Sequence, residues 1–290
     1  MAGAVWRLTF KFASFIYMKH ILGITVLICI TLAAQAQFYY KDLVTVKETN
    51  AQWALLKANG VKTVRLQSYE ANGQPSEGFS VQQRITGNKM VMATATATSR
   101  PSEFTSTYNE AGRLVNTVDT TEDFYASTDY AYDAAGRITT ITSTSRSNEF
   151  ISTEVHAWSY DAAGKPQQML RIRNNTDTTY VTFVYEGKNQ PVEEHAVRKG
   201  NKEPDTYYYY NDKDQLTDIV RYSLKARRLL PTHVFAYTAQ GRLGAMMLVP
   251  EGTNQYQRWY YDYNDKGLKI RDRLYNKQQE LDGKVEFIYE

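Results

Sequence analysis

The apolar positions of this chain follow two patterns, one continuous run near the N-terminus and short alternating segments over the rest. The run covers residues 21–34, follows Lys19 and His20, and ends at an Ala-Gln-Ala site at 34–36. A basic flank, a short apolar core and a small-residue site predict a secretory signal peptide that is cleaved before Gln37. The run is too short for a membrane anchor, because a helix needs roughly 20 apolar residues to span a bilayer.

The predicted leader comprises residues 1–36. Met18 suits the start of the signal peptide, so residues 1–17 are interpreted as an N-terminal extension. The only cysteine, Cys29, lies inside the apolar run, and Ile28 stands where a lipidation site requires a small residue. Cleavage would leave a chain with no cysteine and no stable membrane span. Its stability must then come from packing and β ladders rather than from disulfides.

Residues 37–60 are expected to form a helical cap, with the helix itself over 42–60. Thr45 and Glu48 have the spacing of a capping box, and Gly60 suits a left-handed C-terminal cap. The apolar side of this helix is expected to pack over one end of the sheet, where a repeat array has an open edge. That side consists of Leu43, Val46, Trp53 and Leu56. The strands expected next cover 61–70, 77–86 and 89–98.

The remainder of the chain repeats a tyrosine followed by a turn, at spacings of 24, 28, 25, 25, 27 and 26 residues. Two clear copies read Tyr-Asn-Glu-Ala-Gly-Arg-Leu at 108–114 and Tyr-Asp-Ala-Ala-Gly-Arg-Ile at 132–138. A fixed period indicates a repeat architecture, here a strand, a tight turn, a second strand and a longer connection in each unit. The repeat tyrosines are Tyr108, Tyr132, Tyr160, Tyr185, Tyr210, Tyr237 and Tyr263, with a degenerate copy at Tyr69.

Turn geometry explains the polar and glycine positions of this motif. Asp or Asn opens a type I turn by accepting backbone hydrogen bonds, and the glycine three residues later takes the left-handed conformation that closes a hairpin with a bulge. Where glycine is missing, Asn189 and Asp214 are expected to replace it, because these residue types tolerate that conformation best. The structural turn residues are therefore Asp133, Gly136, Asp161, Gly164, Gly112, Gly241 and Gly267.

An aromatic residue precedes the repeat tyrosine by two positions in six of the seven copies. Residues i and i+2 of a strand share a face, so each repeat presents an aromatic pair on one side of the sheet. Two interpretations stay open: the face is the packed interior, or part of it is an exposed platform for a ligand. In the second case the candidate ligand-stacking residues are Trp158, Tyr208, Trp259 and Tyr261.

Together these patterns predict an all-β fold. We expect an antiparallel meander of consecutive hairpins that is strongly curled and carries a short N-terminal helix as a cap. The repeat sheet is expected to form one domain over residues 61–290. Composition agrees, because the 23 tyrosines suit a half-buried pleated surface. At 42% hydrophobic and 22% charged residues, the chain lies in the ordinary globular range.

Charge argues against a nucleic-acid partner. The whole chain has 34 basic and 31 acidic residues, but Arg7, Lys11 and Lys19 lie in the predicted leader, which has no acid. The mature protein would therefore be neutral, whereas a nucleic-acid-binding surface needs a basic field.

The mature sequence carries no recognisable catalytic, cofactor or metal motif. Its histidines, His156, His195 and His233, are isolated and lack the spacing of metal ligands. Glu193 and His195 would share a strand face and have the residue types for acid–base work, but a solvated strand edge explains them more simply. The repeated carboxylates are explained as turn formers rather than as a glycosidase pair. We therefore expect no enzyme activity, no cofactor and no metal.

The motif at 132–138, with its variant at 160–166, resembles the YD repeat of RHS-type proteins. The resemblance extends over residues 100–270, and the chain is similar to the small exported YD-repeat proteins of Bacteroidota. It implies a long antiparallel sheet that curls, which in large RHS proteins forms a shell around a toxin. It also implies an association with surface carbohydrate. This chain is far shorter than a shell-forming member, so a toxin shell is not expected.

The expected function is that of a non-enzymatic exported repeat protein acting as an envelope scaffold or protein-interaction surface. The alternative is a carbohydrate-binding module that uses exposed aromatic side chains. The expected partner is accordingly an envelope protein or a glycan. The expected location is the periplasm, the outer membrane as an associated protein, or the extracellular space.

Overall fold

The computed structural model describes residues 38–290 except 98–100, 149, 224–225 and 250–254. The predicted signal peptide and its cleavage site lie outside the described residues. The helix is α1 (Lys41–Ala58). The strands are β1 (Thr63–Glu70), β2 (Ser80–Thr86), β3 (Lys89–Ala95), β4 (Ser102–Tyr108), β5 (Leu114–Thr120), β6 (Phe124–Tyr132), β7 (Ile138–Ser147), β8 (Ile151–Tyr160), β9 (Pro166–Arg173), β10 (Asp177–Val184), β11 (Glu193–Arg198), β12 (Asn201–Lys202), β13 (Thr206–Tyr210), β14 (Leu216–Ser223), β15 (Arg228–Tyr237), β16 (Leu243–Leu248), β17 (Gln257–Tyr263), β18 (Lys269–Tyr275) and β19 (Leu281–Tyr289).

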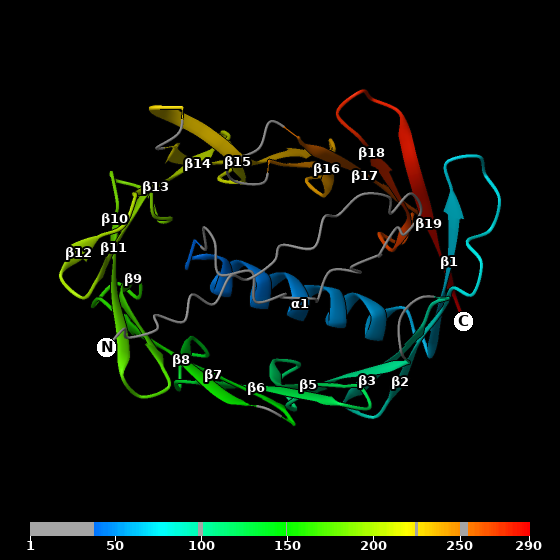
Figure 1. The fold of residues 1–290 in the computed structure, drawn as a ribbon, viewed down its shortest axis with the longest axis horizontal. Coiled ribbons are helices and arrows are strands. Elements are labelled where there is room, and N and C mark those ends of the chain that lie inside the picture. The colour runs from blue at the N-terminus through cyan, green and yellow to red at the C-terminus, as the bar shows by residue number, and fades with distance from the viewer. Residues whose placement is uncertain (1–37, 98–100, 149, 224–225, 250–254) are drawn as a thin grey trace, which may run out of the picture.

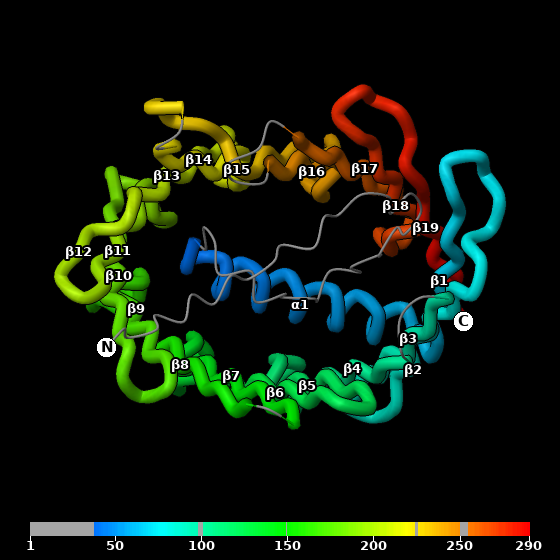
Figure 2. Tube along the Cα trace, in the orientation of Figure 1, coloured from blue at the N-terminus to red at the C-terminus, as the bar shows by residue number. Residues whose placement is uncertain are grey.

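The strands form one antiparallel sheet that closes on itself. Strands pair in chain order, and β11 pairs antiparallel with both the short β12 and β13. β1 pairs with β2 on one side and with β19 on the other, from Val64 opposite Tyr289 to Glu70 opposite Gly283. Figures 1 and 2 show the resulting oval ring, in which cyan β1 lies beside red β19. The predicted all-β, consecutive-hairpin, strongly curled fold is confirmed.

Helix α1 lies inside this ring and runs along its long axis (Figures 1 and 2). The prediction of an N-terminal helix is confirmed, but its expected place over an open sheet edge is wrong, because β1 and β19 close that edge. The capping box is also wrong, since the helix begins at Lys41 after Tyr40 and Thr45 lies in its second turn. Gly60, at φ 66°, has the left-handed conformation that the sequence predicts just beyond the C-terminal end of the helix.

The repeat turns have the geometry that the sequence predicts. Gly136, at φ 80°, donates its backbone N–H to the carbonyl of Asp133 at 2.9 Å, and Asp133 Oδ1 accepts from the backbone of Arg137. The strand register shifts at the neighbouring tyrosine, between Ala131 and Tyr132, as a bulge requires. The other predicted glycines, Gly112, Gly164, Gly241 and Gly267, and the turn residue Asp214 also have positive φ.

One repeat departs from the predicted turn. In the copy that begins at Tyr185, the left-handed residue is Gly187, at φ 70°, and the predicted Asn189 is not among the described residues with positive φ. The glycine comes two positions earlier than in the other copies, and it lies in a bend that covers residues 186–190. Glycine is favoured over asparagine there because it has no Cβ to clash in this conformation.

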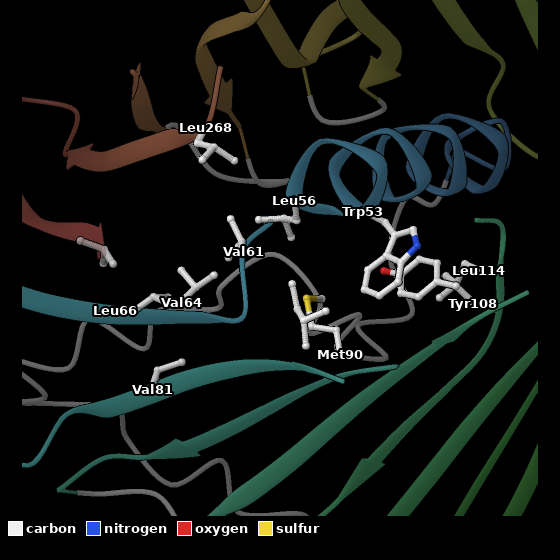
Figure 3. Close-up of a cluster of buried hydrophobic side chains, with 12 residues drawn as sticks. Trp53, Leu56, Val61, Val64, Leu66, Val81, Met90, Tyr108, Leu114 and Leu268 are labelled. Atoms are coloured by element: carbon white, nitrogen blue, oxygen red, sulfur yellow. The ribbon is translucent and has the colours of Figure 1, made fainter. Parts of the chain in front are cut away.

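Two clusters of buried side chains join the helix to the inner wall of the ring. The first contains Trp53 and Leu56 of α1 packed against β1 to β5 and β19 (Figure 3). The second lies under the N-terminal end of the helix, where Val46 meets the inner face of β7 to β11. Its buried members are Tyr39, Val46, Ile138, Ile141, Trp158, Met169, Val181 and Ala196. The interior of the ring is therefore a core organised around one helix.

Candidate functional site

Each repeat tyrosine from Tyr132 onward, and also Tyr289 of β19, is tied to the preceding repeat through its hydroxyl group. Tyr132 donates to the carbonyl of Leu114 at 2.6 Å, and Tyr160 donates to that of Ile138 at 2.7 Å. In each case the acceptor lies six residues after the previous repeat tyrosine. The same bond joins Tyr185 to Pro166, Tyr210 to Pro191, Tyr237 to Leu216, Tyr263 to Leu243 and Tyr289 to Lys269. We call this series the tyrosine ladder.

A cation from the previous turn covers the ring of most ladder tyrosines. The guanidinium of Arg137 lies 4.7 Å from the ring centre of Tyr160, and Arg113 lies over Tyr132 at 5.8 Å. Lys165, Lys188 and Arg242 lie over Tyr185, Tyr210 and Tyr263 in the same way. Such contacts add to the hydroxyl bond. The tyrosine and the basic residue of the motif therefore link one hairpin to the next, which sequence reasoning missed although the choice of Tyr over Phe pointed to it.

Replacing Tyr160 with phenylalanine should lower the free energy of unfolding by about 0.5–1.5 kcal/mol, because the carbonyl of Ile138 loses its donor while the ring remains. Urea denaturation followed by circular dichroism measures this. Tyr209→Phe is the matched control, since that side chain is 50% exposed on the outer face, and its unfolding energy should not change. Equal losses in both variants would contradict the ladder.

The structure places three of the four candidate ligand-stacking residues in the core. Trp158 is 5% exposed and stacks on Phe183, while Tyr208 is 3% and Tyr261 8% exposed. Trp259 shares the inner face with Tyr261 and is half-buried. The aromatic row is thus the packed interior, and the buried rings of Trp158, Tyr208 and Tyr261 offer no free face on which a sugar could stack.

These positions predict the response of tryptophan fluorescence to acrylamide. In the chain from residue 38 onward, Trp53 and Trp158 are buried and Trp259 is half-buried. We expect the quenching constant to fall in a Trp259→Phe variant, because the remaining two indoles are shielded. A Trp158→Phe variant is the control and should quench at least as strongly as the parent protein. Strong quenching that survives Trp259→Phe would contradict the buried placement.

The segment before the helix is held by a buried carboxylate. Glu194 on β11 is 3% exposed and accepts the backbone N–H groups of Tyr39 at 2.9 Å and Tyr40 at 2.9 Å. The hydroxyl of Tyr208 donates to the same side chain at 2.7 Å. Burial raises the pKa of Glu194, while these three donors act in the opposite direction. Glu194 thus supplies the N-terminal hydrogen bonds that the predicted capping box does not.

A second polar network anchors the first turn of α1. Asp42 Oδ2 lies 2.6 Å from His156 Nδ1, Glu154 Oε1 lies 3.0 Å from His156 Nε2, and Glu154 Oε2 accepts from Arg171 at 2.7 Å. Burial alone would lower the pKa of His156, but Asp42 and Glu154 outweigh it and raise the pKa to about 9. The imidazolium is therefore stabilised between two carboxylates that come from the helix and from β8.

This network predicts a loss of stability at alkaline pH. Because the folded pKa of His156 is about 9 and the ordinary value is 6.5, the folded protein keeps a proton that the unfolded chain releases. The stabilisation is complete below pH 6.5 and disappears as the pH rises through 9. Between pH 6 and 9 the free energy of unfolding should fall by roughly 2 kcal/mol. The measurement is urea denaturation at both values.

A His156→Gln variant is the matched comparison for this pH effect. It should be less stable than the parent at pH 6 and should show a much smaller change up to pH 9. His233 acts in the opposite direction near pH 6, because burial lowers its pKa to about 4 while the unfolded chain still binds that proton. This contribution is the same in both proteins, so it cancels in the comparison. An unchanged slope in the variant would contradict the assignment.

Glu193 and His195, the pair that the sequence suggests for acid–base chemistry, belong to an ion-pair network that also includes Asp205 and Lys202. His195 Nδ1 lies 2.6 Å from Asp205 Oδ1, and His195 Nε2 lies 3.3 Å from Glu193 Oε2. Lys202 binds the other oxygen of Asp205 at 2.9 Å. These groups form a partly exposed ion-pair network beside the β11–β12 turn. Across the part of the chain that the structure describes, no group of three or more His, Cys, Asp or Glu side chains could hold a metal ion.

The outer face of the ring carries its most exposed large apolar side chains along one arc, from the start of β8 to β15. Tyr180 on β10 lies opposite Val197 on β11, and Tyr222 on β14 lies opposite Leu229 on β15. Among the described residues the set is Phe150, Ile151, Tyr180, Val197, Tyr209, Tyr222 and Leu229. We call it the apolar arc; its strands run from the lower left through the left end to the upper left of the ring in Figure 1. The described residues include no helix that is long and apolar enough to cross a membrane.

Hairpins tied together by tyrosine hydroxyls around a closed sheet define a closed β-repeat protein. The family model described as RHS Repeat matches residues 108–147, a segment that holds two of the repeat tyrosines, Tyr108 and Tyr132. The expected resemblance to the YD repeats of RHS-type proteins is therefore confirmed. No curated protein matches the sequence.

Similar solved structures include toxin chains and porin-like proteins. The Tc holotoxin pore of Photorhabdus luminescens matches with 13% identity, a TM-score of 0.33 and coverage of 73% of this chain. This chain spans only 12% of the length of that toxin chain. A porin-like protein from Bacteroides uniformis matches with 11% identity and a TM-score of 0.31, covering 79% of this chain and 98% of the other. A porin-like protein from Bacteroides vulgatus gives 10% identity and a TM-score of 0.26, with the same coverage.

Proposed function

We propose that this chain is a non-enzymatic, exported repeat protein of the cell envelope, whose closed sheet is a rigid scaffold that presents the apolar arc to a protein partner. The scaffold part of the proposal is supported by the closure of β1 on β19 and by the tyrosine ladder, which join neighbouring hairpins around the ring. A closed sheet has no free seam for edge-to-edge association. Its contacts with other proteins must therefore use the outer face, the rims or the loops.

The observation that carries the interaction role is the apolar arc itself. Soluble proteins normally expose large apolar side chains singly, and groups of them mark interaction sites. Here the two directly opposed pairs, Tyr180 with Val197 and Tyr222 with Leu229, lie on four strands of one arc. Tyrosine also suits a protein interface, because it buries a large rigid ring and keeps a hydrogen-bonding hydroxyl.

The carbohydrate-binding alternative loses its original residues, because Trp158, Tyr208 and Tyr261 are buried in the ring. Export and an envelope location rest on the predicted signal peptide at residues 18–36.

Site-specific photocrosslinking in the native envelope tests the interaction role. A photoreactive phenylalanine analogue replaces Tyr180 in the exported protein, and adducts are detected after irradiation of intact cells. The matched control carries the same analogue at Arg84, an exposed position on β2 away from the arc. We expect a discrete protein adduct from position 180 and not from position 84. Adducts that are absent or equal at both positions would overturn the proposal.

A further inference from the structure

The outer face of β17 and β18 carries a small pocket that the proposed scaffold role does not use. Its walls are Arg258 and Tyr260 of β17, Arg273 and Tyr275 of β18, and Gln279 of the turn before β19. Arg258 lies opposite Tyr275 and Tyr260 lies opposite Arg273, so arginine and tyrosine alternate in a square across the two strands. Because the neighbouring Tyr261 points into the core, this square faces outward. The pocket is open to solvent on one side, and its volume is about 220 Å³.

Contacts with neighbouring side chains hold four of the five pocket side chains in place. The rings of Tyr260 and Tyr275 meet edge to face, with centres 5.4 Å apart and planes at 88°. Arg273 donates to Asp262 Oδ1 at 2.9 Å and lies over the Tyr260 ring. Arg258 lies 5.2 Å from the ring centre of Tyr256. A site that is ordered before a ligand arrives loses less entropy on binding.

One arginine of the pocket, Arg258, has no carboxylate partner among the described residues. The carboxylate of Asp262 is shared between Arg271, at 2.8 Å, and Arg273, at 2.9 Å. Across the described part of the chain, no Asp or Glu lies within ion-pair distance of Arg258, whose contact is with an aromatic ring. Arg258 therefore retains its hydrogen-bond donors for an anion.

We propose that this pocket binds an organic monocarboxylate that carries one ring. The carboxylate accepts hydrogen bonds from the guanidinium of Arg258, whose planar fork matches two carboxylate oxygens. The ring of the ligand packs against the phenol rings of Tyr260 and Tyr275. At about 220 Å³ the space lies below the range of about 300–1,000 Å³ that is usual for drug-sized ligands, so it suits a single ring. The ring is aromatic or a sugar, since both stack on tyrosine.

Calorimetric titration of the mature protein at low salt tests this assignment. Benzoate and glucuronate are the probes, because they share the carboxylate and differ in the ring. Benzyl alcohol and glucose are the neutral counterparts, and phenyl phosphate is the dianion. We expect at least one carboxylate to bind, at least about ten-fold more tightly than its neutral counterpart. If only benzoate binds, the ring of the natural ligand is aromatic. If only glucuronate binds, the ring is a sugar. If both bind, the pocket accepts either kind of ring.

An Arg258→Gln variant should weaken carboxylate binding by about ten-fold or more, because it removes the charged donor and leaves a shorter, neutral polar side chain. Arg84→Gln on β2 is the matched control and should bind as the parent does. Thermal denaturation must show that both variants fold as the parent does. The proposal is overturned if neither carboxylate binds, if neutral rings or phenyl phosphate bind as tightly as the carboxylates, or if Arg258→Gln binds unchanged. These outcomes are independent of crosslinking at Tyr180, so this proposal and the proposed function can fail separately.

Discussion

Replacing Trp53 with alanine is expected to lower the free energy of unfolding by about 3–5 kcal/mol, the largest effect of any single substitution considered in this protein. Trp53 is 5% exposed and stacks on Tyr108 with ring centres 4.0 Å apart and planes at 5°. It joins the internal helix to the first buried cluster (Figure 3), so its removal leaves a cavity between α1 and the wall of the ring. Urea denaturation followed by circular dichroism measures the loss.

Two variants of the helix serve as comparisons for Trp53→Ala. Gln52→Ala changes the adjacent exposed position, and its effect should stay within about 0.5 kcal/mol. Trp53→Phe keeps an aromatic ring against Tyr108 and should lose less than the alanine variant. If Trp53→Ala cost no more than Gln52→Ala, the helix would not be a core element of the ring, and the assignment of the first cluster would fail.

Replacing Glu194 with alanine is expected to cost about 2–5 kcal/mol, because it leaves several buried donors without an acceptor. The affected groups are the backbone N–H groups of Tyr39 and Tyr40 and the hydroxyl of Tyr208. Hydrogen exchange of the two backbone amides should accelerate together with the loss of stability. Both effects arise because the segment that leads into the helix loses its attachment to β11.

Glu194→Gln and Glu193→Ala separate this anchor from a general effect of charge. Glutamine keeps one carbonyl oxygen for the same donors, so its cost should be clearly smaller than that of alanine. Glu193 faces the opposite side of the strand and is half-buried beside His195, so its removal should cost about 0–1 kcal/mol. Equal losses for Glu193→Ala and Glu194→Ala would contradict the assignment of Glu194 as the anchor.

The hairpins could be predicted from the sequence because their determinants are local. Asp133, whose side chain accepts a backbone hydrogen bond, and Gly136, which has the left-handed conformation, are three residues apart and belong to the same turn. The period of the motif then gave the order of the strands, since consecutive hairpins pair with their neighbours. The Tyr185 copy shows the limit of this argument, because its glycine, Gly187, stands two positions before the motif's place and takes the left-handed conformation there.

The candidate site was harder to predict because its parts are distant in the chain. Glu194 meets Tyr39 across a separation of 155 residues, and Asp42 meets His156 across 114. No spacing in the sequence relates these residues. The sequence singled out Glu193 and His195 rather than Glu194, because it does not show which face of β11 points into the ring. The pocket on β17 and β18 was missed for the same reason, since its square exists only through strand register.

The sequence by itself determined the hairpin unit, its tight turns and the presence of an N-terminal helix, because each depends on residues within a few positions of one another. The tertiary structure decided the rest. Closure of β1 on β19 removed the open edge, placed the helix inside the ring and turned the aromatic row inward around it. The physical reason is burial: a closed ring has one inner face, and the aromatic side chains lose the most contact with water by facing it.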